Sequence, residues 1–86
     1  MRKLVYMECT STFKNPVTPK VLIVRGKRFP VNTILQRAKM QAVRTPSATH
    51  LYFQLQLKNR QIVDVLYDES KKEWYLDDYE SFQFDA

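Results

Sequence analysis

Positively charged side chains gather in two short stretches of the sequence. The first stretch surrounds the only glycine and the second follows about ten residues later; together they contain Lys20, Arg25, Lys27, Arg28, Arg37, Lys39 and Arg44. Lysine and arginine bind phosphate groups, so both stretches are candidates for contact with nucleic acid or another polyanion. The alternative is a solvated surface whose charges serve solubility only.

Three residues further along add other chemistry to this set. Tyr52, Gln54 and Lys58 fall at every second or fourth position of one segment, on the polar side of its alternating pattern. Exposed nucleic-acid bases stack on aromatic rings, and glutamine side chains hydrogen-bond base edges. We therefore include these three residues in the candidate nucleic-acid-binding set.

The charges are divided unevenly along the chain. Residues 1–60 contain twelve Lys and Arg residues and one acid, Glu8, whereas residues 61–86 contain two Lys residues and eight acids. Such asymmetry accompanies nucleic-acid contact or an acidic tail. The alternative is that the two parts neutralise each other across the fold.

The last eight residues form an acidic, aromatic tail after an expected domain at residues 1–78. Tyr79, Phe82 and Phe84 are candidates for anchoring a protein partner, because aromatic side chains often do so. Two other readings stay open. The rings could cover the domain's own core, or the tail could dock on the basic surface as an electrostatic latch.

Residues for catalysis or metal binding are scarce. His50 is the only histidine and Cys9 the only cysteine, and no nucleophile stands near a base. We expect no enzymatic activity, no cofactor and no metal site. A single cysteine suits a reducing compartment, so we expect a cytoplasmic protein. The longest apolar run, residues 21–24, is far too short to span a bilayer, and we expect no signal peptide and no membrane contact.

The hydrophobic pattern predicts the elements that position these residues. Alternation of apolar and polar side chains indicates strands at about residues 3–10, 51–58 and 61–67, and shorter β-rich runs indicate strands at 21–24, 28–31 and 73–76. Gly26 is expected at the first central position of a type II′ hairpin turn, and Asn59-Arg60 in a two-residue turn. The three C-terminal strands should pair as a meander.

One helix is predicted at about residues 33–43. Thr33 and Gln36 fit a capping box, and Ile34, Leu35, Ala38 and Ala42 fall on one side of a helix. Pro46 would end it. The fold class is therefore α+β and mostly β: an antiparallel curled sheet or a small open barrel of about six strands, with one helix.

Parts of the sequence resemble an uncharacterised family of small bacterial β-rich domains of unknown function. The resemblance rests on the segment Arg25–Val31, on Tyr52, on the Tyr67-Asp68 pair and on Trp74-Tyr75-Leu76, and it spans about residues 19–78. Arg37 stands where the family has a tryptophan. The resemblance implies a small β-rich domain, and because some members accompany DNA-damage polymerases, it implies a nucleic-acid setting.

The sequence therefore predicts a small non-enzymatic binding module. Its expected partner is nucleic acid or another polyanion, contacted by the basic hairpin and the polar face of the helix. The alternative is a protein–protein interaction or homodimerisation module that uses sheet edges or the aromatic tail.

Overall fold

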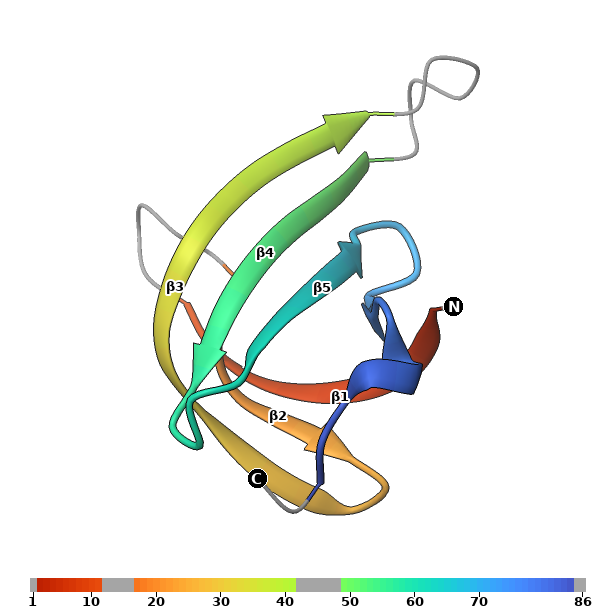
Figure 1. Cartoon of the computed structure of the whole chain (residues 1–86). Coiled ribbons are helices and arrows are strands. Elements are labelled where there is room, and N and C mark those ends of the chain that lie inside the picture. Colours follow the sequence, from red (N-terminus) through yellow and green to blue (C-terminus); the bar gives the residue numbers. More distant parts are fainter. Residues whose placement is uncertain (1, 12–16, 42–48, 85–86) are drawn as a thin grey trace.

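The computed structural model describes residues 2–11, 17–41 and 49–84. They form six strands and one short 3-10 turn: β1 (Lys3–Thr10), β2 (Thr18–Val24), β3 (Lys27–Gln41), β4 (Thr49–Leu57), β5 (Ile62–Asp68), β6 (Glu73–Leu76) and η1 (Tyr79–Ser81). Each strand pairs antiparallel with the next in the chain, and β1 also pairs with β6, which closes the sheet into a barrel (Figure 1).

The core fills the inside of this barrel with the apolar side of each strand. Phe53, Leu55 and Leu57 of β4 are at most 1% exposed, as their strict alternation with polar residues requires. Trp74 of β6 stacks at a tilt on Phe53, with ring centroids 5.5 Å apart. Burial of these side chains is the main force that holds the closed sheet together.

The prediction of a mostly β, antiparallel domain with about six strands is confirmed, and the predicted helix at residues 33–43 is wrong. Residues 33–41 belong to β3, which pairs with β4 along most of its length. Two β-bulges occur there, and they leave Asn32 and Leu35 without register partners on β4, although the Asn32 side-chain amide donates to Gln56 Oε1 (3.4 Å). Each bulge breaks the period of two. The apolar residues Ile34, Leu35 and Ala38 therefore do not alternate with polar ones, and their spacing resembles the apolar stripe of a helix. Ala42 lies outside the described residues.

The two turns at one end of the barrel also differ from the prediction. Arg25 and Gly26 both have positive φ, 53° and 77°, between the paired residues Val24 and Lys27. This is the pattern of a type I′ turn with glycine at the second central position, rather than type II′. Between Leu57 of β4 and Ile62 of β5 lie four residues rather than two, Lys58 to Gln61, and Arg60, not Asn59, is left-handed with φ 75°.

The C-terminal segment, residues 79–84, packs against the barrel beside these two turns. Phe82 is 9% exposed and belongs to the core, and its ring meets Phe29 edge-on at 4.9 Å. The Gln61 side-chain amide donates to the Gln83 carbonyl (2.8 Å), and the Gln83 N–H donates to the Gln61 side-chain oxygen (3.2 Å). The segment is thereby fixed to the start of β5.

The closure of the barrel is narrow. β1 pairs with β6 through only three residues, Lys3 to Val5, and Tyr6 to Thr10 pair with β2 instead. β3 likewise pairs with β2 only from Lys27 to Pro30 and then continues with β4 alone among the described strands. Beyond Pro30, β3 therefore has β4 as its only described neighbour, whereas β4 stays paired with β5 from Gln56 to His50.

Candidate nucleic-acid interface

An open hollow of about 530 Å³ lies between the β2–β3 and β4–β5 turns and the C-terminal segment. Three cationic side chains and two aromatic rings are among the residues that line it: Lys27, Arg28, Phe29, Pro30, Leu57, Lys58, Asn59 and Phe84. No acidic residue occurs in this described lining. The hollow has the size of small-molecule sites, which fall between about 300 and 1,000 Å³.

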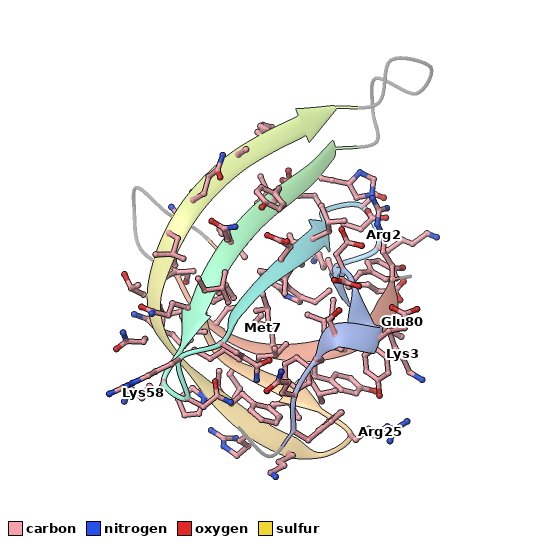
Figure 2. All side chains as sticks on the ribbon, viewed as in Figure 1. Arg2, Lys3, Met7, Arg25, Lys58 and Glu80 are labelled. Atoms are coloured by element: carbon pink, nitrogen blue, oxygen red, sulfur yellow. The ribbon has the colours of Figure 1, made fainter. Side chains whose placement is uncertain are left out.

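Hydrogen bonds to backbone carbonyls hold two of the cationic residues in place around the hollow. The Lys58 N–H donates to the Pro30 carbonyl (2.9 Å), which ties the β4–β5 turn to β3. The Lys27 Nζ donates to the Phe84 carbonyl (3.0 Å) and lies 5.9 Å from the centre of the Phe29 ring. Lysines from two distant parts of the sequence therefore line one hollow. Figure 2 shows Lys58 at the β4–β5 turn.

Arg28 reaches the hollow while paired with a carboxylate. Its guanidinium donates two hydrogen bonds to Glu8 across β2, one of them at 2.8 Å and the other to Oε2. The two side chains are 57% and 48% exposed. Their hydrogen bonding lowers the pKa of Glu8 and raises that of Arg28. The pair is exposed, so an incoming phosphate can compete with Glu8 for the guanidinium.

The Arg25 guanidinium contacts aromatic rings of the C-terminal segment. Its guanidinium carbon lies 5.8 Å from the centre of the Tyr79 ring and 5.7 Å from that of Phe84. Lys3 approaches the Tyr79 ring as well, at 4.9 Å. These cation–π contacts help to fix the rings beside the turn.

The other predicted cations lie away from the hollow. Lys20 is the extra residue of a β-bulge in β2, opposite Glu8 and Cys9. Arg37 lies over the Phe53 ring at 5.2 Å, and Lys39 follows it toward the far end of β3. Arg44 is outside the described residues. The structure thus brings Lys27, Arg28 and Lys58 together, with Arg25 on the adjacent turn, and separates them from Arg37 and Lys39.

Tyr52 and Gln54 lie on the outer side of β4, facing β5 and its acids. The Tyr52 hydroxyl donates to Asp64 Oδ1 at 2.6 Å, and this hydrogen bond, with desolvation, raises the pKa of Tyr52 to about 12. Gln54 is the register partner of Asp64. The carbonyl of Asp64 in turn accepts from the Asp77 N–H (2.9 Å). Tyr52 and Gln54 therefore have acidic surroundings, and neither residue adds to the basic hollow.

The three aromatic residues of the tail have different surroundings. Phe82 is in the core, Tyr79 lies under Lys3 and Arg25, and Phe84 borders the hollow. The Tyr79 hydroxyl is buried and has no hydrogen-bond partner among the described residues. Phe84 is half-buried and is therefore the ring of this segment that a ligand in the hollow would meet.

His50 contacts Asp68 at the end of β5. Its Nε2 lies 3.6 Å from Asp68, whose Oδ1 accepts from the Ser70 hydroxyl (2.8 Å). That bond and backbone N–H donors lower the pKa of Asp68 and fix the β5–β6 turn. Within residues 2–11, 17–41 and 49–84, no three His, Cys, Asp or Glu side chains group as metal ligands would. None of the helical structure described is long or apolar enough to cross a membrane.

Sequence reasoning missed the uncharged part of the hollow. Phe29, Pro30 and Asn59 line the hollow, and none of them was predicted as a binding residue. The signal was present, because Phe29 and Pro30 directly follow the basic turn and Asn59 directly follows Lys58. Comparisons with known proteins add nothing to this interpretation: no family model fits the chain, and no curated protein or solved structure is significantly similar to it.

Proposed function

We propose that this domain binds nucleic acid through the end of the barrel formed by its β2–β3 and β4–β5 turns. The observation that carries the proposal is the hollow in which Lys27, Arg28 and Lys58 meet without an acidic residue in the described lining. Clustered lysine and arginine side chains attract phosphates and release their counterions, which is the main source of affinity for nucleic acids.

The distribution of charge over the barrel supports the same surface. Glu8 is the only acid among residues 1–60, which include β1 to β4, whereas the other eight acids fall in residues 61–86, which include β5, β6 and η1. Because neighbouring strands in the chain are neighbours in the sheet, the division along the sequence becomes a division across the molecule. A polyanion approaching this molecule is therefore steered toward the β2–β3 side.

The test is the affinity for a fluorescent oligonucleotide, measured by anisotropy at two salt concentrations. We expect affinity to fall steeply as salt rises, with a slope of about 0.7 to 0.9 per phosphate contact. A Lys27→Ala/Lys58→Ala variant should bind more weakly and show a shallower slope.

The matched control is Lys71→Ala/Lys72→Ala, which removes the same charge from the β5–β6 turn. It should change the affinity much less than the first variant. Salt-independent binding, or equal losses in the two double variants, would contradict the proposal, because the basic hollow would then have no special part in binding.

A second candidate function is homodimerisation, and the outer surface of β1 favours it. Tyr6 is 73% exposed and Leu4 52% exposed, and both line a hollow of about 420 Å³ beside Trp74. In the same place Tyr6 to Thr10 pair with no described strand on the side away from β2. An exposed apolar surface beside a free strand edge is a common site of association.

Sedimentation at several concentrations tests this second candidate. A dimer that Tyr6→Lys converts to a monomer, and that Leu35→Lys on β3 leaves intact, would support it. Leu35 is a suitable control because it is similarly exposed and lies away from β1. A wild-type protein that stays monomeric at every concentration would exclude it.

A further inference from the structure

We infer that the hollow takes single-stranded nucleic acid, with a base against the Phe84 ring and neighbouring phosphates on Lys27 and Lys58. This inference rests on the proposed function and specifies its ligand. A site for single strands combines cations that follow the backbone with a ring on which a base can stack, whereas a duplex keeps its bases stacked inside and offers phosphates at its surface. The hollow contains both kinds of group.

The geometry of the Phe84 ring leaves it suited to stacking. It meets the rings of Phe29, Tyr79 and Phe82 at interplanar angles of 67°, 75° and 78°. None of these three rings therefore lies parallel over Phe84, and the parallel arrangement that a nucleobase prefers is not taken by them. The Arg25 guanidinium lies over the Phe84 ring, 5.7 Å from its centre, so a base that stacks on this face displaces the guanidinium or stacks on it.

The cations of the hollow are placed around this ring rather than along a long surface. Lys27 is fixed to the Phe84 carbonyl itself, and Lys58 comes from the opposite turn. The next described cation on β3, Arg37, is nine residues beyond Arg28, about 30 Å along an extended strand. A compact group of this kind suits a few nucleotides of flexible strand better than an extended duplex.

The experiment compares three fluorescent probes with the full chain: a twelve-nucleotide oligothymidylate, a strand of the same length without bases, and a twelve-base-pair duplex. The oligothymidylate should bind most tightly. Phe84→Leu fills a similar volume without an aromatic face, so it should weaken oligothymidylate binding by about five-fold or more, the range of one base–aromatic stack. It should leave binding of the base-free strand unchanged, and Phe84→Tyr should retain the wild-type preference.

Each result decides between the two levels of the proposal. Equal affinity for all three probes, lost on raising salt, would overturn the single-strand inference and leave polyanion binding in place. A Phe84→Leu variant that weakens all probes equally, with an unchanged melting temperature, would also overturn it, because the ring would then act without reading bases. Binding to none of the probes would remove the proposed function itself.

Discussion

Glu8 contacts the proposed interface, because its carboxylate accepts two hydrogen bonds from the Arg28 guanidinium. Replacing it with glutamine removes the negative charge and releases the guanidinium for a phosphate. We expect Glu8→Gln to tighten oligonucleotide binding by several-fold at low salt, measured by the same anisotropy titration.

Glu69→Gln is the control for this prediction. It makes the same change in net charge at an exposed position of the β5–β6 turn. If general attraction were the whole effect, the two variants would tighten binding equally. A larger effect of Glu8→Gln identifies the local ion pair as the cause.

Tyr52 provides a prediction of pH dependence. Its hydrogen bond to Asp64 raises its pKa from 10.0 to about 12, so the folded state favours the neutral phenol. Below the unfolded pKa of 10.0, the hydrogen-bonded phenol of Tyr52 makes its full contribution to the stability of the fold. That contribution is lost as pH rises from about 10 to about 12. Ultraviolet absorbance of tyrosinate should show Tyr52 among the tyrosines that titrate late, beside Tyr67, whose pKa burial also raises.

Two variants check the assignment to Tyr52. Tyr52→Phe should remove one late-titrating group, and Asp64→Asn should move the titration of Tyr52 to lower pH because the charged acceptor is gone. A late titration of unchanged amplitude in Tyr52→Phe would show that other tyrosines account for all of it.

At the scale of elements, the C-terminal segment is part of the fold. Phe82 is 9% exposed and contacts Phe29. We expect Phe82→Ala to lower the free energy of unfolding by about 3 kcal/mol, the low end for truncation of a buried phenylalanine, and thermal or urea unfolding measures this. Gln83→Ala, at the exposed neighbouring position, should change it little. Equal stability of Phe82→Ala and wild type would show that the segment is dispensable.

The strands were predictable where the apolar and polar residues alternate without interruption. The pattern from Leu51 to Leu57 and the following two strands appear in the structure nearly as predicted. β3 was not predictable in this way, because its bulges at Asn32 and Leu35 depend on the register with β4. Contacts between distant segments set that register, and a local pattern does not contain it.

The candidate site was partly predictable for the same reason. Lys27 and Arg28 are adjacent in the sequence and follow one turn, so their proximity needed no tertiary information. Lys58 joins them through its backbone contact with Pro30. Tyr52 was placed in the basic set because of its polar position on a strand, but the strand beside it proved to contain Asp64. The predicted meander placed the strand at 61–67 beside Tyr52, but the register that brings Asp64 within reach of the Tyr52 hydroxyl was not visible in the sequence.

At the scale of the whole molecule, the barrel closes where β1 pairs with β6. This β1–β6 seam is the shortest of the ladders between its strands. It has three residue pairs, whereas β4 and β5 share seven. We expect the barrel to open at this seam before it unfolds globally, because few backbone bonds and side-chain contacts must break there.

Native-state amide hydrogen exchange followed by NMR measures this opening. The seam amides of Leu4 and Val5 should exchange faster than those of Phe53 and Leu55 in the centre of the sheet. Low concentrations of denaturant should accelerate amide exchange less at the seam than at the centre, as expected when the seam opens locally. Equal protection of both groups would mean that the barrel opens only as a unit.

The two bulges of β3 have a consequence beyond the register. From Val31 onward this strand has β4 on one side and no described strand on the other. A long flat edge of that kind would be a template for fibrils, because strands of other molecules could be added to it. Asn32 and Leu35 distort the edge, and Arg37 and Lys39 place positive charge along it. The irregularity that concealed the strand in the sequence is therefore a device that opposes aggregation.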